Sequence, residues 1–137
     1  MSSRCYHYKH FKSLLTVERY LVLDIPLTHK RSLSKFRCAS HRLRIEVGRH
    51  LNIPREERIC THCLTSRNVL YIDCEFHAFF YCCKYMYNDI RAQYLLNWYD
   101  RGMEIDDFYI LMNSDCERTI RNVCNYVHHI MCKAIAD

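Results

Sequence analysis

The spacing of apolar positions along the chain predicts a fold made mainly of helices. Between Ser32 and Leu51, apolar side chains recur at steps of three and four, as they do on the buried face of an amphipathic helix. This stripe consists of Leu33, Phe36, Ser40, Leu43 and Val47. Similar spacing predicts further helices over the ranges 6–23, 85–99, 107–113 and 114–134.

Capping residues indicate where the last two helices begin. Asp106 is the predicted N-cap of the helix over 107–113, because its carboxylate can accept a backbone N–H of the first turn. Ser114 and Glu117 form a predicted S-x-x-E capping box at the start of the final helix. The apolar positions of that helix share one face and are expected to be buried: Ile120, Val123, Cys124, Val127, Ile130, Met131 and Ala134.

One stretch lacks helical spacing. From Arg58 to Ile72 the sequence is typical of a short β-hairpin, since residues 65–68 are turn formers and residues 69–72 are β-prone. Asp73 follows as the predicted N-cap of another helical segment. The overall prediction is a mainly α fold, with about five helices around one small hairpin.

The hairpin region carries the most specific motif of the chain, C-x2-C-x13-H-x4-C, formed by Cys60, Cys63, His77 and Cys82. Two cysteines separated by two residues can bind one metal ion from a tight turn, and the later histidine and cysteine can complete a tetrahedron. Thiolate and imidazole are the ligands of structural Zn2+ sites. Because four protein ligands leave no coordination position open, the motif predicts structural rather than catalytic Zn2+.

Neighbouring side chains compete for a place in this ligand set. His62, Cys74 and Cys83 are close enough in sequence to substitute, and Cys83 is the direct alternative to Cys82 as fourth ligand. Without a metal, the cluster would be a set of buried, reduced thiols. A thioredoxin-like redox motif is a further alternative, but it requires a helix directly after the cysteines, where we predict a loop.

Charge is distributed unevenly along the chain. Residues 28–58 hold nine Lys and Arg against three Glu, whereas residues 100–117 hold six Asp and Glu against one Arg. A cationic helix face can follow a phosphate backbone, because each cation releases condensed counterions. A solvated face, or neutralisation by the acidic segment, is the alternative. The predicted nucleic-acid-binding side chains of the 32–51 helix are Lys35, Arg37, Arg42, Arg44 and Arg49.

Composition narrows the class of protein. The 137 residues are 50% hydrophobic and include only two Gly, which favours one compact, helix-rich domain over disorder. Ten cysteines occur, mostly within helix-patterned segments, and residues 1–10 lack the apolar core of a signal peptide. We therefore expect an intracellular protein, in the nucleus or the cytoplasm. No run approaches about 18 uncharged apolar residues, so we expect no membrane span.

These features divide one predicted domain, residues 1–137, into three parts. A basic helical part covers 1–58, a zinc-binding element covers 59–83, and a further helical part covers 84–137. The sequence shows no nucleophile beside a base, no open metal site and no Gly-rich phosphate loop. We therefore expect a non-catalytic protein rather than an enzyme.

Several motifs resemble those of one known family. They are Lys35-Phe-Arg-x-x-x-His41-x-Leu-x-Ile-Glu46-x-Gly-Arg49, Arg58-x-Cys-x-x-Cys63, Asp73-x-Glu-x-His77 with x4-Cys82, Tyr85, Arg91, and Phe108-x-x-Leu-Met-x-Ser114. Together they resemble the zinc-binding C-terminal region of reverse transcriptases from LINE-like, non-LTR retrotransposons of animals, over roughly residues 20–137. That family usually has Pro after the last cysteine, where this chain has Cys83.

The resemblance implies a zinc-stabilised module that binds nucleic acid beside a polymerase, although no polymerase or nuclease motif is recognised in this chain. RNA or DNA is therefore the expected partner, with Zn2+ as the cofactor. Two alternatives belong to other classes. One is a zinc-stapled module that docks on a protein through the acidic and aromatic surface, and the other is an inert transposon remnant.

Overall fold

The computed structural model describes residues 18–82, 84 and 104–135 of the chain. Their regular structure consists of α2 (Arg19–Val22), α3 (Leu27–Arg37), α4 (Arg44–His50), the 3-10 helix η1 (Arg55–Glu57), α5 (Thr61–Arg67), α6 (Glu75–Phe80), α9 (Ile105–Met112) and α10 (Glu117–Ile135). The predicted mainly α fold is confirmed, and none of the described residues forms a regular strand. The helix predicted over 85–99 and most of that predicted over 6–23 lie outside the described residues.

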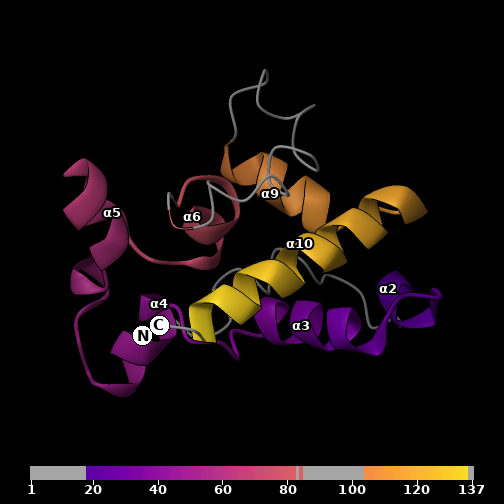
Figure 1. The fold of residues 1–137 in the computed structure, drawn as a ribbon, viewed down its shortest axis with the longest axis horizontal. Coiled ribbons are helices and arrows are strands. Elements are labelled where there is room, and N and C mark those ends of the chain that lie inside the picture. Colours follow the sequence, from indigo (N-terminus) through magenta and orange to yellow (C-terminus); the bar gives the residue numbers. More distant parts are fainter. Residues whose placement is uncertain (1–17, 83, 85–103, 136–137) are drawn as a thin grey trace.

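Helix α10 is the central element of the described fold. It lies between α3 on one side and α6 and α9 on the other (Figure 1), and it contacts all three as well as α2. Val123, Cys124, Val127 and Ile130 are buried on its inner face, at the spacing of one helical stripe. The predicted buried stripe is confirmed, with Ala134 partly buried at its end. None of the described helices combines the length and apolar character that crossing a membrane requires.

An aromatic cluster attaches α6 to this core. Phe79 and Phe80 of α6, Phe108 of α9 and Tyr126 of α10 are fully buried. The rings of Phe79 and Tyr126 meet edge to face, with centroids 4.8 Å apart, and the Tyr126 hydroxyl donates a hydrogen bond to the Phe79 carbonyl at 2.6 Å. That bond satisfies a buried polar group and fixes the distance between the two helices. Helix α6 also carries His77.

Helix α3 ends before the sequence pattern predicts. Ala39 has a positive φ of 59°, in the left-handed region that terminates helices. The Ser40 N–H donates to the Lys35 carbonyl at 2.7 Å, and the Ala39 N–H donates to the Phe36 carbonyl at 3.4 Å. This pair of bonds is a Schellman motif, here with Ala in the place where Gly is usual. The prediction of a single helix over 32–51 is therefore wrong, because this range contains the end of α3 and all of α4.

The chain becomes helical again at α4 because of contacts from a distant residue. The Asp73 carboxylate accepts the Arg44 backbone N–H at 2.9 Å, and the Asp73 carbonyl accepts the Ile45 N–H at 3.0 Å. Both are N–H groups that the first turn of a helix leaves without intrahelical partners. Apolar spacing missed the break, because Leu33 of α3 and Ile45 of α4 are buried in the same core.

The hairpin predicted over 58–72 is reduced to one isolated antiparallel bridge, between Ile59 and Ile72. The predicted loop is helix α5. The Cys60 sulfur accepts the Cys63 N–H at 3.5 Å at the start of this helix, in the position of an N-cap. The segment between the two bridged residues is therefore partly helical, where a hairpin would have extended strands.

The N-caps predicted for the last two helices are also wrong. Helix α9 is capped by Glu104 rather than Asp106, in a capping box with Asp107, whose carboxylate accepts the Glu104 N–H at 2.9 Å. A reciprocal pair satisfies two N–H groups, which one Asp cap does not. Helix α10 begins at Glu117 itself, so Ser114 and Glu117 do not form the predicted capping box.

Gly48 of α4 is required by close packing against Arg58. A Cβ atom at position 48 would lie 2.5 Å from Arg58 Cγ. The Arg58 side chain passes over the glycine and donates to the carbonyls of Ile53 (2.8 Å) and Ile45 (3.2 Å). These bonds join α4 to the segment that leads into the cysteine motif.

Candidate metal centre

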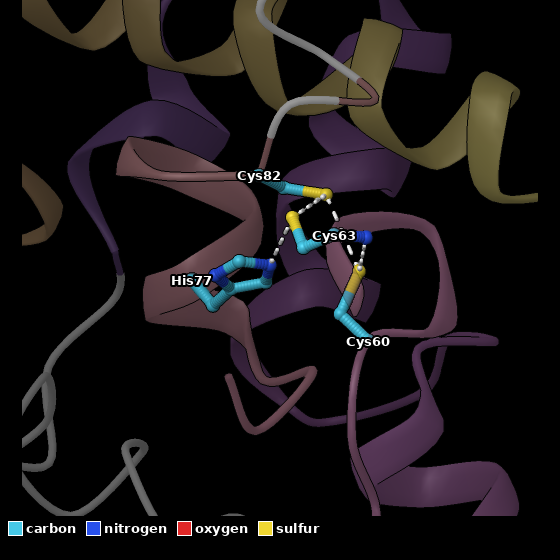
Figure 2. A group of neighbouring side chains, drawn as sticks. All are labelled: Cys60, Cys63, His77 and Cys82. Atoms are coloured by element: carbon cyan, nitrogen blue, oxygen red, sulfur yellow. Dashed lines mark hydrogen bonds between the residues drawn. The ribbon is translucent and has the colours of Figure 1, made fainter. Parts of the chain in front are cut away.

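Four side chains from two short helices and their flanks meet at one point (Figure 2). Cys60 precedes α5 and Cys63 lies in its first turn, whereas His77 lies in α6 and Cys82 follows it. The bridge between residues 59 and 72 brings the two halves of the motif side by side. All four side chains predicted as ligands are therefore together.

The distances within this cluster fit a tetrahedral metal site. Cys60 Sγ and Cys82 Sγ are 3.7 Å apart, Cys63 Sγ and Cys82 Sγ are 4.0 Å apart, and Cys63 Sγ lies 3.5 Å from His77 Nε2. A tetrahedron with ordinary Zn–S and Zn–N bond lengths has edges of about 3.8 Å between sulfurs and about 3.6 Å between sulfur and nitrogen. All four ligand atoms lie within 4.8 Å of one another.

Burial and chemistry agree with this geometry. The exposed fractions of Cys60, Cys63, His77 and Cys82 are 4%, 0%, 3% and 1%. Three thiols and one imidazole that converge in the interior, away from water, form a donor set suited to a soft or borderline metal ion. The set provides four ligands, which fill a tetrahedral shell. The cluster could therefore hold one metal ion with no position left for a substrate.

The thiols interact strongly even as free groups. The hydrogen bond between the sulfurs of Cys60 and Cys82 lowers the pKa of the Cys60 thiol and raises that of the Cys82 thiol, because one sulfur accepts while the other donates. Burial adds to the rise at Cys82 and opposes the fall at Cys60. A thiolate is the form that binds metal, and the cluster stabilises it at Cys60.

The competing ligands have different positions. His62 is exposed on α5, and Cys74 is buried before α6, outside the group of four. Burial raises the pKa of the Cys74 thiol to about 11, so this thiol stays protonated at neutral pH. Cys83 lies outside the described residues. Cys82 is thus the fourth member of the cluster in the described part of the chain.

Helix α5 directly follows Cys60, as a helix does in thioredoxin-like redox motifs. We expected a loop after the cysteine pair, which would have spoken against a thioredoxin-like redox motif, and the structure has a helix there. The positions of His77 and Cys82 favour a metal site over a redox motif, because both approach Cys60 and Cys63 as closely as ligands of one ion do. A simple two-cysteine redox motif does not require His77 or Cys82.

Two contacts position the histidine and its helix. The His77 ring stacks on Tyr71, with centroids 4.8 Å apart, while its Nδ1 is buried without a hydrogen-bond partner among the described residues. At the start of α6, Glu75 Oε1 lies 2.8 Å from His41 Nε2, in a buried pair. His41 and Glu75 carry no functional signal in the sequence beyond their place in the family resemblance. Their role is to hold α6 against the segment before α4.

The five cations predicted to bind nucleic acid do not share one helix face. Arg37 is 3% exposed, and it donates to the Met112 carbonyl at 2.6 Å and pairs with Glu18 at 3.4 Å. It is therefore a structural residue, and its predicted surface role is wrong. Arg49 is partly exposed and pairs with Glu46 at 2.7 Å.

The other three predicted cations are on the surface. Lys35 is exposed on α3, Arg42 is exposed in the connection between α3 and α4, and Arg44 is exposed at the start of α4. Among the described residues, no partner hydrogen-bonds or ion-pairs with the guanidinium groups of Arg42 and Arg44. Three of the five predicted cations are therefore exposed, but the break between α3 and α4 places them on different segments instead of on one helix face.

Comparison with protein families, with curated proteins and with solved structures gives no match for this chain.

Proposed function

We propose that this chain is a zinc-stabilised, non-catalytic module that binds RNA or DNA. The observation that carries the proposal is the buried cluster of Cys60, Cys63, His77 and Cys82, whose spacing matches a tetrahedral site. The cluster ties together α5 and α6, which are too short to be stable alone. Its function in the proposal is to hold a shape rather than to perform chemistry.

Zinc is the proposed ion because of the ligand types. Three thiolates with one imidazole are a common ligand set for structural Zn2+, and Zn2+ accepts tetrahedral geometry without electronic preference. Hard ions such as Mg2+ and Ca2+ require oxygen ligands, and the cluster provides none. Binding free energy at such a site contributes directly to folding.

Nucleic acid is the proposed partner because of exposed charge on α3 and around the start of α4. Lys35, Arg42 and Arg44 are exposed on neighbouring segments, and the chain has a formal net charge of +5. Exposed cations on a rigid frame favour phosphate contacts, which supply most of the affinity of non-specific binding. The sequence resemblance to the zinc-binding region of non-LTR retrotransposon reverse transcriptases points to the same partner, and we propose a shared origin with that region.

Metal analysis of the purified chain tests the first half of the proposal. We expect one Zn2+ per chain, and loss of that ion in Cys60→Ser, because a serine hydroxyl is a poor zinc ligand at neutral pH. Cys132→Ser is the matched control, since Cys132 is exposed and outside the cluster. Unchanged zinc content in Cys60→Ser would show that the cluster is not the site.

A salt titration of oligonucleotide binding tests the second half. Single- and double-stranded RNA and DNA are each titrated between low and physiological salt, with and without a chelator. We expect log affinity to fall linearly with log salt, with a slope of about −0.7 to −0.9 per phosphate contacted. Affinity that stays flat with salt contradicts the proposal. Partner proteins recovered after nuclease treatment, without any oligonucleotide binding, would favour a protein-docking module instead.

A further inference from the structure

A basic pocket opens directly beside the metal centre. Its cavity volume is about 310 Å3, at the small end of the range of about 300–1,000 Å3 for ligand pockets. It is lined from separate stretches of the chain, by Arg42 and Arg44 next to α4, by His62 on α5, and by Lys84 beyond Cys82. Segments that are distant in sequence thus bring three formal positive charges to one cavity.

The negative groups that line the pocket are buried. Asp73 lines the cavity but is buried, and its carboxylate accepts the Arg44 backbone N–H rather than pairing with the guanidinium of Arg42 or Arg44. Cys60 and Cys82 also line the cavity and are buried. With zinc bound, the three thiolates would leave a single formal negative charge on the centre. The pocket therefore combines exposed guanidinium groups with buried negative groups.

We propose that this pocket holds one phosphate-bearing nucleotide of a bound RNA or DNA strand, with the phosphate between Arg42 and Arg44. This inference rests on the proposed function and adds the place of contact to it. Guanidinium groups present planar pairs of N–H donors that match phosphate oxygens. The cavity has room for one small unit and not for a duplex.

The pocket also depends on the metal. Because Cys60 and Cys82 form part of its wall, the ion that draws their sulfurs together also sets the distance between α5 and Lys84. Metal binding and phosphate binding are therefore coupled through shared wall residues. Chelation should abolish the pocket contact before it unfolds α3 and α10.

Paired charge-removal variants of the full, zinc-loaded chain test this inference. Arg42→Ala/Arg44→Ala removes two charges from the pocket, and Arg31→Ala/Arg118→Ala removes two exposed charges elsewhere. We expect the pocket variant to lose roughly tenfold or more in affinity for a single-stranded oligonucleotide. The slope of log affinity against log salt should become shallower by about 0.7 to 0.9, the value of one phosphate contact, while the control variant changes affinity less than threefold. Zinc content and circular dichroism verify that both variants are folded.

The outcomes separate the pocket from the wider proposal. If the wild-type chain binds oligonucleotides with a steep salt dependence and both variants lose affinity equally, the pocket inference is overturned and the proposed function stands. If the wild-type chain binds none, both fail. A neutral methylphosphonate oligonucleotide should bind the wild-type chain no more tightly than the natural strand binds the pocket variant, because it lacks every phosphate charge and not only the one in the pocket. Tight binding of adenosine monophosphate without binding of any strand would also overturn the inference.

Discussion

Two regions of this molecule are stabilised in different ways. The helical core consists of α3, α9 and α10, where long apolar stripes pack around Phe36, Phe108 and Val127. The cysteine lobe consists of α4, η1, α5 and α6 with Cys82, and its α-helices have only six or seven residues each. Isolated helices of that length are unstable in water, so the lobe depends on its cysteine–histidine cluster, on individual polar contacts and on the aromatic packing of α6 against α9 and α10.

The difference shows what each kind of stabilisation can support. Apolar packing in the helical core is spread over many side chains, so most of its stability does not come from any one polar contact. Apart from the aromatic packing of α6, the lobe has few spread apolar contacts and relies on the four clustered side chains and on bonds such as that from Arg44 to Asp73. Because few side chains of the lobe are needed for its stability, most of its surface positions can carry charged residues. The same dependence on few side chains makes the lobe the first region to fail when one ligand is lost.

The largest expected effect is the loss of the lobe when the metal is removed. Cys63→Ser should abolish metal binding, and with it an apparent stabilisation of the order of 10 kcal/mol. Hydrogen exchange should become fastest in α5 and rise less in α6, whose Phe79 packs on Tyr126, while the amides of α10 stay protected. Cys116→Ser, at an exposed thiol, is the control. Equal loss of protection in both regions would mean that the molecule is one cooperative unit and that the comparison is wrong.

A cavity in the helical core should have a smaller but more global effect. Phe36 is fully buried, so Phe36→Ala should lower the free energy of unfolding by about 3–5 kcal/mol. Denaturant titration measures this value, and zinc content below the transition should stay at one ion per chain. Leu51→Ala is the control, since Leu51 is 64% exposed and its truncation should change stability by less than about 0.5 kcal/mol. A loss of zinc that precedes unfolding in Phe36→Ala would contradict the separation of the two regions.

The smallest effect is a pH dependence confined to the helical core. His29 of α3 stacks on His128 of α10, with centroids 4.7 Å apart. Burial and the nearby imidazoles of His128 and His129 lower the pKa of His29, so the unfolded chain binds more protons than the folded one. Stability from this group is present above the unfolded pKa of about 6.5 and is lost as pH falls through the lower folded pKa.

His29→Gln should therefore reduce the acid-induced fall in α10 protection between pH 7.5 and pH 5.5. The expected change is small, because the ring is only partly buried. Acid also protonates metal ligands, so the variant and the wild-type chain must be compared at the same zinc saturation. The same acid-induced fall in both proteins would exclude this contribution.

The cluster of three cysteines and one histidine could be predicted from sequence because its signal is local and chemical. Cysteine and histidine are rare enough that their spacing alone identifies the cluster, and the apolar stripe of α10 is equally direct. The form of the segment between Cys60 and Ile72 was missed, because a seven-residue helix and a hairpin loop have similar compositions. In that segment, packing rather than propensity decides the structure.

The cationic surface could not be predicted from sequence, since distant residues decide it. Ala39 ends α3 without the Gly that normally indicates such a turn. Asp73, far along the chain, then starts α4. The burial of Arg37 depends on the Met112 carbonyl and on Glu18, which no periodicity connects to it. The helix assignment failed at one residue, and the error changed which cations share a surface.

Gly48 and Arg58 offer a way to recognise relatives of this chain whose overall similarity has faded. Because the Arg58 side chain crosses the space that a Cβ at position 48 would occupy, a larger residue at 48 requires that side chain to move. A profile that scores this pair jointly, alongside the four ligands, would separate true relatives from chance cysteine patterns. A larger residue at 48 beside an arginine at 58 would mark a chain with a different packing.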